Sequence, residues 1–303
     1  MLNIEKYGAV DIGSNAIRLL VATVIENPGK ETHFKKTSLV RVPIRLGADV
    51  FLDGKISEVN KLRMIDAIKA FQLLMKTHNI VRFRACATSA MREASNGVEI
   101  ASLIKKETGL VINIIDGNDE AAIIASTDLK SLIQNDKAFL YVDVGGGSTE
   151  FTVFANGKTT SSKSFKLGTV RLINDMVEDT MWERVEEWIK ENTKNFSKIS
   201  MIGSGGNINS IHKHSGKKIG KPLTYMYLAS YYDLIRSYSF EERIFEMDMN
   251  PDRADVIIPA TRIYLSAMKW SKSKNVFVPK IGLSDGIIKS LYNEKNAEML
   301  EVH

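Results

Sequence analysis

Two short stretches combine acidic side chains with glycines and small hydroxylated residues, a combination suited to binding phosphate. The first reads DIGSN from Asp11, and the second reads VDVGGGSTE and ends at Glu150. A tight turn of such residues points successive backbone N–H groups into one concavity, and concavities of this kind bind phosphate-type anions. Turn chemistry alone also selects Gly and Asp, but the presence of two such stretches favours a site for a phosphorylated ligand.

The aspartate at the start of each stretch predicts a metal ion. Asp11 and Asp143 each follow an apolar run and stand just before the glycines. A carboxylate beside a bound phosphate would be repelled by it unless a divalent cation lay between them. Mg²⁺ is commonly held by one or two carboxylates together with phosphate oxygens. We therefore expect Mg²⁺, or another divalent cation such as Mn²⁺, as the cofactor.

A third glycine loop, IGSGGNINSI from Ile202, follows a strand pattern and precedes a helix pattern. Strand-to-helix glycine turns are common in α/β folds, so this loop indicates a phosphate site only in combination with the other two. The pattern GxxxxGK[ST] and a strict GxGxxG are both absent from the sequence, which argues against a P-loop or dinucleotide-binding domain.

The elements around these motifs form two similar series. Residues 7–25 have the pattern of a β-hairpin. The following residues predict a strand at 33–46, a helix from Ser57, a strand in VRFRACATSA, a helix at 95–108, a strand at 111–116 and a helix capped by Asn118 or Asp119. Residues 138–154 repeat the opening hairpin, with Asp11 aligned on Asp143 and Gly13 on Gly145. The repetition predicts two related α/β domains, residues 1–130 and 131–303.

The composition is that of a globular protein, with 44% hydrophobic and 25% charged residues among 303. No apolar run approaches the ~20 residues that span a bilayer, and the N-terminus lacks a secretory pattern, so we expect a cytoplasmic protein without a membrane partner. Cys86 is the only cysteine, which excludes an intramolecular disulfide. The net charge of +5 weakly favours anionic partners. The basic stretch at 212–221 fits either an electropositive lip or an ordinary solvated loop.

Seven ordered stretches resemble the successive signatures of the exopolyphosphatase and guanosine pentaphosphate phosphatase (Ppx/GppA) family, within the actin, Hsp70 and sugar kinase superfamily. They are DIGSNAIRLLV, ATSAMREASN, GNDEAAI, VDVGGGSTE, GSGGN, DRADVIIPA and GLSDGI, and they run from about residue 7 to 290. The resemblance implies two ribonuclease H-like domains of the actin-like ATPase superfamily, an active site in the cleft between them, and a last helix able to pack back on the first domain. It also implies Mg²⁺-dependent release of terminal phosphate from polyphosphate or pppGpp, and a homodimer.

The same resemblance assigns roles to individual residues. Glu120 matches the family's proposed catalytic base, which would activate water for in-line attack on the terminal phosphorus. Asp143 and Glu150 match acids of the second phosphate motif and are catalytic and metal-binding candidates, with Asp11 as a third metal ligand. The phosphate-binding candidates are Ser14, Asn15, Arg18, Arg92, Gly145, Gly146, Gly147 and Ser148, and the third glycine loop contributes Gly205, Gly206 and Asn207.

Without the resemblance, two of these residues have simpler interpretations. Glu120 would complement the dipole of its helix, a contribution of about 0.3–1 kcal/mol. Arg18 would belong to an ordinary ion pair. The family's Glu-Glu-Ala motif here reads Asp119-Glu120-Ala121, so the first acid is shortened while the base position is kept.

Departures from the family pattern bear on substrate choice. Asn207 stands where the family usually has the Thr of Gly-Gly-Thr, and 284–286 read Ser-Asp-Gly where Arg-Glu-Gly is common. The chain also lacks the HD-like extension of longer members, which favours short polyphosphates or a guanosine penta- or tetraphosphate as the ligand. The alternative functions are a catalytically reduced sensor of (p)ppGpp or polyphosphate, and an ATP-dependent kinase, which Glu120 and ATSAMRE disfavour. No nucleic acid partner is expected.

Overall fold

The computed structural model describes residues 2–125, 127 and 137–301. The chain forms two compact units. Unit 1 comprises residues 1–127 and 283–303, and unit 2 comprises residues 128–282. The expected boundary between residues 130 and 131 lies outside the described residues.

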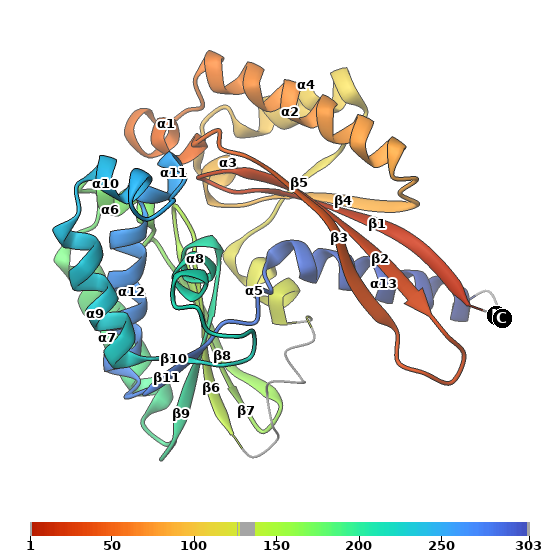
Figure 1. The fold of residues 1–303 in the computed structure, drawn as a ribbon. Coiled ribbons are helices and arrows are strands. Elements are labelled where there is room, and N and C mark those ends of the chain that lie inside the picture. Colours follow the sequence, from red (N-terminus) through yellow and green to blue (C-terminus); the bar gives the residue numbers. More distant parts are fainter. Residues whose placement is uncertain (1, 126, 128–136, 302–303) are drawn as a thin grey trace. The chain divides into compact units, whose positions relative to one another are not determined.

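Unit 1 is built on a five-stranded sheet in the order β3-β2-β1-β4-β5 (Figure 1). The neighbouring strands β1, β2 and β3 are antiparallel, whereas β4 runs parallel to β1 and β5 parallel to β4. This is the ribonuclease H-like strand order. Its elements are β1 (Asn3–Ile12), β2 (Ile17–Glu26), β3 (His33–Val42), α1 (Leu46–Asp53), α2 (Glu58–Thr77), β4 (Arg82–Ala87), α3 (Ser89–Glu93), α4 (Gly97–Thr108), β5 (Ile112–Ile114), α5 (Gly117–Ala125) and α13 (Leu283–Glu301).

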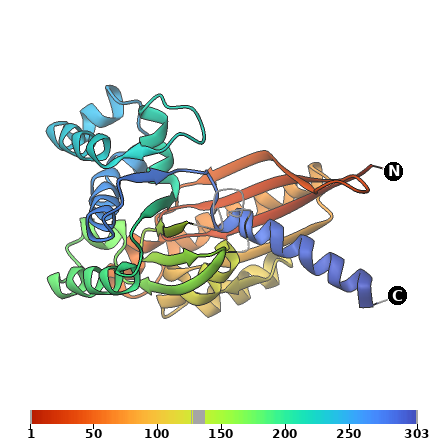
Figure 2. The ribbon, with the colours of Figure 1, turned by 90° about the horizontal axis from the view of Figure 1, so that it is seen from below.

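Helices cover both faces of this sheet, which explains the nearly continuous apolar runs of its central strands. The last six residues of β1 are all buried. The helix α13 contacts β1, β2 and β4, while α2 and α4 lie on the opposite face (Figures 1 and 2). Ser57 caps α2 by accepting a hydrogen bond from the Asn60 N–H, which confirms the predicted start of that helix.

The side chain of Asn96, just before α4, pairs with the backbone of Ile56, just before α2, through two hydrogen bonds. The Asn96 amide donates to the Ile56 carbonyl and accepts from the Ile56 N–H, both at 2.9 Å. A single asparagine therefore satisfies two backbone groups that would otherwise need a partner.

Unit 2 repeats the architecture in a six-stranded sheet, β10-β11-β9-β6-β7-β8. The order β8-β7-β6-β9-β11 matches that of unit 1, with β10 added antiparallel at the edge. The predicted pair of ribonuclease H-like domains is therefore confirmed. The elements are β6 (Ala138–Val144), β7 (Thr149–Ala155), β8 (Lys158–Phe165), α6 (Thr169–Ile173), α7 (Asp179–Thr193), β9 (Ile199–Ser204), α8 (Gly206–His214), β10 (Leu223–Thr224), α9 (Tyr225–Ser237), α10 (Phe240–Phe245), α11 (Pro251–Ala254), α12 (Ile257–Trp270) and β11 (Asn275–Phe277).

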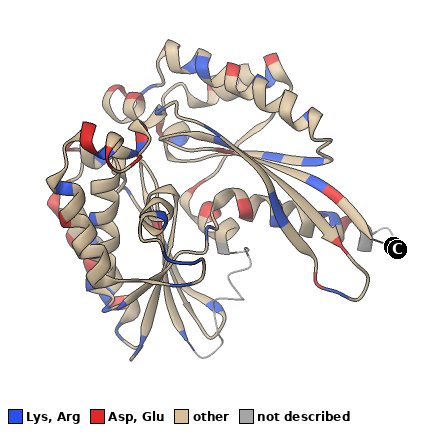
Figure 3. Cartoon of the chain, in the orientation of Figure 1, with Lys and Arg blue, Asp and Glu red and all other residues tan. Residues whose placement is uncertain are grey.

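The core of unit 2 lies between its sheet and α12, which also contacts α6, α7, α8 and α9. Charged side chains of both signs are spread over the elements of both units (Figure 3). Within the described residues, no helix combines the length and apolar character needed to cross a membrane.

The predicted basic stretch at 212–221 is only partly a surface loop. His212 is buried, and His214 lies at the end of α8. The His214 ring stacks on Tyr231, its Nε2 lies 3.1 Å from the Met247 carbonyl oxygen, and its Nδ1 lies 2.7 Å from the Tyr231 hydroxyl. Because the carbonyl only accepts, Nε2 donates to it, and in the neutral imidazole Nδ1 then accepts from the Tyr231 hydroxyl.

Candidate functional site

The two hairpins that carry the first two glycine motifs have the same geometry. In unit 1 the ladder pairs Asp11 with Arg18, and in unit 2 it pairs Asp143 with Glu150. The turns close with equivalent hydrogen bonds, Gly13 N–H to the Ala16 carbonyl at 3.1 Å and Gly145 N–H to the Ser148 carbonyl at 2.9 Å. The predicted alignment of the two motifs is therefore confirmed. The residue facing the aspartate differs: it is basic in unit 1 and acidic in unit 2.

In unit 1 the candidates gather at the carboxyl ends of parallel strands, where α/β sheets place their ligands. Asp11 is next to last in β1 and pairs with Cys86 of β4. Arg92 lies on α3, which follows β4, and Glu120 lies on α5, which follows β5. The pKa of the Cys86 thiol is raised to about 11, chiefly by burial and to a smaller extent by Asp11 and Glu120, against the opposing effect of Arg84. Both carboxylates therefore act on the same buried thiol.

Arg18 forms an ion pair with Asp11, Nη1 to Oδ2 at 3.1 Å. Asp11 is 6% exposed, and its burial raises its pKa above the usual value while Arg18 opposes that shift. These two groups were predicted to bind metal and phosphate.

The turn after β1 is tied to the start of α1. The Gly47 N–H donates to the Ser14 carbonyl at 2.8 Å, and the Arg45 N–H donates to the Asn15 carbonyl at 3.0 Å. A Cβ on Gly47 would lie 2.9 Å from the Ser14 Cβ, so only glycine allows this approach. The Ser14 hydroxyl lies 2.9 Å from the hydroxyl of Ser89 on α3. The predicted phosphate-binding turn is therefore fixed by both α1 and α3.

Glu120 lies in the first turns of α5 and is buried, with 9% of its surface exposed. The cap of α5 is Asp116, whose Oδ1 accepts from the N–H groups of Asn118 at 2.7 Å and Asp119 at 2.9 Å. The predicted cap, Asn118 or Asp119, was wrong because an aspartate immediately before the helix satisfies both donors. Arg92 donates to the Ile115 carbonyl at 2.7 Å, so its guanidinium is held against the segment that leads into α5.

In unit 2 three successive carbonyls of the glycine loop point toward α6. The Gly145 carbonyl accepts from the Thr169 N–H at 3.0 Å, and the Gly146 carbonyl accepts from the Val170 N–H at 2.8 Å. The Gly147 carbonyl accepts from Nε of the buried Arg171 at 2.8 Å. A trans peptide holds its C=O and N–H on opposite sides. The N–H groups of the next three residues, Gly146 to Ser148, therefore point away from α6 as one row.

Asp143 and Glu150 face each other across β6 and β7 beside this loop. Glu150 is 2% exposed, and its Oε1 accepts from the hydroxyls of Ser148 at 2.7 Å and Ser164 at 2.8 Å. Like charges directly opposite in a sheet destabilise it, and a divalent cation would remove that penalty. Carboxylate and hydroxyl oxygens are hard donors that suit Mg²⁺ or Mn²⁺. These residues therefore fit the expected ion.

Three or more His, Cys, Asp or Glu side chains do not gather into a metal-binding cluster anywhere in residues 2–125, 127 and 137–301. Mg²⁺ usually keeps several waters and takes one or two carboxylates together with substrate phosphates. The Asp143 and Glu150 pair matches that smaller donor set. Asp11 belongs to the other unit.

The third glycine loop lies beside the second because β9 runs parallel to β6. Ser204 pairs with Asp143 in the ladder, and its hydroxyl donates to Asp143 Oδ2 at 3.2 Å. Gly205 has φ of 99°, and a Cβ there would lie 3.2 Å from Asp143 Oδ1. Unit 2 therefore brings both predicted glycine loops to the same aspartate.

Arg253 contacts Asn207, the residue of this loop that departs from the family pattern. Its Nη1 donates to Asn207 Oδ1, and a Cβ on Gly206 would lie 2.5 Å from its Nη2. Asn207 is buried. The second predicted departure, at 284–286, lies at the start of α13 in unit 1. There Asp285 pairs with Lys36 at 2.8 Å, and a Cβ on Gly286 would lie 2.3 Å from the Ile123 carbonyl oxygen of α5.

Three residues at this site were not predicted from the sequence: Gly168, Arg171 and Arg253. The first two stand in KLGTVRL, whose only signal is a glycine before a short helix. Arg253 stands in DRADVIIPA, which entered the analysis as a whole motif without a role for its arginine. In each case the role comes from a contact with a glycine loop distant in sequence.

Comparison with known proteins places these features in a family. Residues 28–295 match the model of the Ppx/GppA phosphatase family. A bifunctional 3-dehydroquinate synthase/phosphatase of Fusobacterium nucleatum is 31% identical over 229 residues, covering 67% of this chain and 34% of the relative. Exopolyphosphatase 1 of Mycobacterium tuberculosis is 27% identical over 174 residues, covering 57% of this chain and 49% of the relative. The chain thus spans half or less of the length of these curated relatives.

Solved structures agree with this placement. The Ppx/GppA family member from Aquifex aeolicus is 25% identical, with a TM-score of 0.77 and coverage of 97% of this chain and 99% of that one. An exopolyphosphatase from Cytophaga hutchinsonii, 23% identical, has the same fold, with a TM-score of 0.83 over 96% of this chain and 98% of that one. The chain belongs to the Ppx/GppA phosphatase family.

Proposed function

We propose that this protein is a Mg²⁺-dependent phosphohydrolase that releases the terminal phosphate of inorganic polyphosphate. The observation that carries the proposal is the glycine loop of unit 2, whose three carbonyls are held on one side by α6. The opposite side presents a row of N–H groups, an arrangement that binds phosphate oxygens. Family membership and the relatives named as exopolyphosphatases support the reaction type.

In this proposal each predicted residue has a separate task. The N–H groups of Gly146, Gly147 and Ser148 hold oxygens of the terminal phosphate. Asp143 and Glu150 would hold Mg²⁺, which neutralises charge on the phosphoryl oxygens when bound. Glu120 accepts a proton from the attacking water. Arg18 and Arg92, which also belong to unit 1, supply positive charge, since the planar guanidinium of an arginine can bind two phosphate oxygens at once.

The direct test is phosphate release from polyphosphates of several lengths in the presence of Mg²⁺. Glu120→Gln should lower kcat by about 10²–10⁴-fold, the usual contribution of a positioned general base, while calorimetric binding of polyphosphate stays nearly unchanged. Asp119→Asn is the matched control, because it removes the exposed neighbouring carboxylate. Full activity in the Glu120 variant would remove this residue from the role of base. No release from any chain length, nor from pppGpp, would overturn the proposal.

A second candidate function is a sensor that binds pppGpp, ppGpp or polyphosphate with little turnover. The contact between Arg253 and Asn207 favours it. The family usually has threonine at the position of Asn207, and here the asparagine side chain accepts a hydrogen bond from Arg253. Tight binding by calorimetry without phosphate release would select the sensor. Release from pppGpp in preference to polyphosphate would instead make the nucleotide the substrate.

A further inference from the structure

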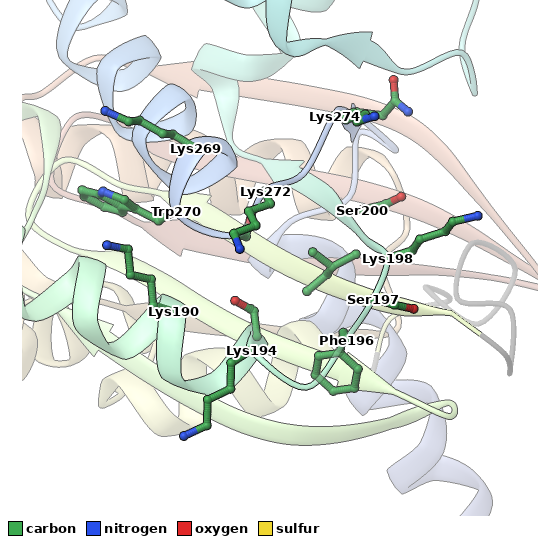
Figure 4. Close-up of a pocket in the computed structure, with 14 residues that line it drawn as sticks. Lys190, Lys194, Phe196, Ser197, Lys198, Ser200, Lys269, Trp270, Lys272 and Lys274 are labelled. Carbon is green, nitrogen blue, oxygen red and sulfur yellow. The ribbon is translucent and has the colours of Figure 1, made fainter.

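A pocket of about 810 Å³ in unit 2 is lined, among the residues that the structure describes, by six lysines and by no aspartate or glutamate (Figure 4). Ligand pockets are usually about 300–1,000 Å³, so this one is large enough for a small molecule or a segment of chain. The lysines are Lys190, Lys194, Lys198, Lys269, Lys272 and Lys274.

The ends of two helices build this pocket. Lys190 and Lys194 come from the end of α7 and the residue after it, and Lys198 precedes β9. The other three lysines come from the end of α12 and the segment leading to β11. Figure 4 shows Lys272 and Lys190 approaching the space between the two helix ends.

The pocket is remote from the candidate active site in the same unit. It includes Ile199, the first residue of β9, whereas Ser204, the last residue of that strand, contacts Asp143. A strand rises about 3.3 Å per residue, so these two ends of β9 lie about 16 Å apart. The lysines therefore form a separate site.

The positive charge of the pocket exceeds what its own helices neutralise. Lys190 pairs with Glu186 at 2.5 Å, and Lys194 pairs with Glu191 at 3.6 Å. In the part of the chain that the structure describes, the remaining four lysines form no ion pair. Lysines also complement the partial negative charge at helix ends, about half a charge for each helix. After both effects, an excess of about three positive charges remains.

One lysine also adopts a backbone conformation that favours other residues. Lys272 follows α12 with φ of 57°, in the left-handed region. Glycine and asparagine enter this region most easily, and other residues do so at a cost of about 1–2 kcal/mol. A charged side chain is thus placed next to five others at a position where glycine would fit better.

We propose that this pocket binds a segment of inorganic polyphosphate, at least three phosphates long, away from the site of hydrolysis. The choice of polyphosphate as the physiological ligand rests on the proposed function. Lysines act as point charges that impose no planar geometry, which suits a flexible chain of evenly spaced negative charges. Trp270 packs edge-on against Trp182, with the two ring centroids 6.2 Å apart, and a chain of phosphates needs no aromatic surface.

The test is a lysine-acylation footprint of the wild-type protein, read by mass spectrometry. The probes are tripolyphosphate, a longer polyphosphate and pppGpp, each added with a chelator that prevents Mg²⁺-dependent turnover. We expect severalfold protection of Lys198, Lys272 and Lys274 by the longer polyphosphate. Three lysines in the last turns of helices in unit 1, Lys76, Lys105 and Lys106, are matched controls that should label equally with and without it.

A pair of triple variants makes the test quantitative. Replacing Lys198, Lys272 and Lys274 by alanine should weaken calorimetric binding to this site at least about tenfold and reduce its salt dependence, because fewer counterions are released. The same replacement of the three control lysines should leave binding unchanged. Glu120→Gln should keep the footprint, so loss of hydrolysis and loss of this site are distinguishable. Equal labelling with and without polyphosphate, or protection by pppGpp alone, would overturn the proposal.

Discussion

Replacing Gly168 by alanine tests whether the close fit between α6 and the glycine loop supports binding. A Cβ at this position would lie 2.2 Å from the Gly146 carbonyl oxygen and 2.4 Å from the carbonyl carbons of Gly146 and Gly147. The backbone of Gly168 has φ of −124° and ψ of 159°, which alanine adopts without strain. Any effect of the substitution therefore comes from the steric clash.

The size of the effect follows from the overlap. Carbon atoms in contact lie about 3.5–4.0 Å apart, so the loop or α6 must move by about 1 Å. The atoms that would have to move are backbone atoms. Overpacking of this kind costs about 1–3 kcal/mol of stability, and a misplacement of about 1 Å near reacting groups costs about 100-fold in rate. We expect both losses in Gly168→Ala.

Two measurements check this prediction: urea denaturation for the free energy of unfolding, and phosphate release for kcat/KM on polyphosphate. Gly282→Ala is the control, because the new Cβ would meet only the Ser204 hydroxyl at 3.7 Å, an ordinary contact. The control should retain about the stability and activity of the wild type. If Gly168→Ala matched it in both measurements, the loop would tolerate displacement and our account of its N–H row would be refuted.

Three further substitutions test separate contacts. Burial lowers the pKa of His214, so the unfolded chain binds its proton more tightly and the free energy of unfolding should fall as pH drops through about 6.5. Urea denaturation from pH 8 to about 5 should show a smaller fall in His214→Phe than in the wild type, and an equal fall would show that this histidine is not the cause. Asn96→Asp should cost about 1–3 kcal/mol of unfolding free energy, because a carboxylate would face the Ile56 carbonyl; an unchanged melting temperature would contradict this. Arg253→Lys should raise KM or lower kcat about tenfold by removing the planar fork, and unaltered steady-state kinetics would show that the third loop needs no arginine.

The sequence predicted the elements whose apolar spacing is strong, and it missed those that depend on contacts. The two hairpins were found because buried strands follow both glycine motifs. The strand β8, KTTSSKSF, was missed because it is a mostly exposed edge strand with almost no apolar residues. Its pairing with β7 makes it a strand. The helix α1 was missed because eight residues carry too little periodicity, and its start follows a left-handed Arg45.

The candidate site divides in the same way. The acids and glycines of one motif could be identified as site residues from the sequence, because the residues that would bind the ligand are the same ones that form the turn. Gly168 and Arg171 could not, since they contact a loop more than twenty residues earlier, Gly168 by a close backbone approach and Arg171 by a hydrogen bond. The fixed direction of three carbonyls, and hence of the N–H groups, is visible only once α6 is in place.

The position of α13 has a consequence for how the protein is made. This helix covers β1, β2 and β4, yet the whole of unit 2 lies between them in the sequence. A ribosome therefore completes unit 2 while one face of the first sheet still lacks its helix, although domains generally fold in the order of synthesis. The unit whose synthesis begins first is then completed last, and until α13 is made the apolar face of its sheet is exposed to chaperones. Joining Leu283 directly to Thr127 in a shortened gene would supply the helix at once and let unit 1 fold as one continuous segment.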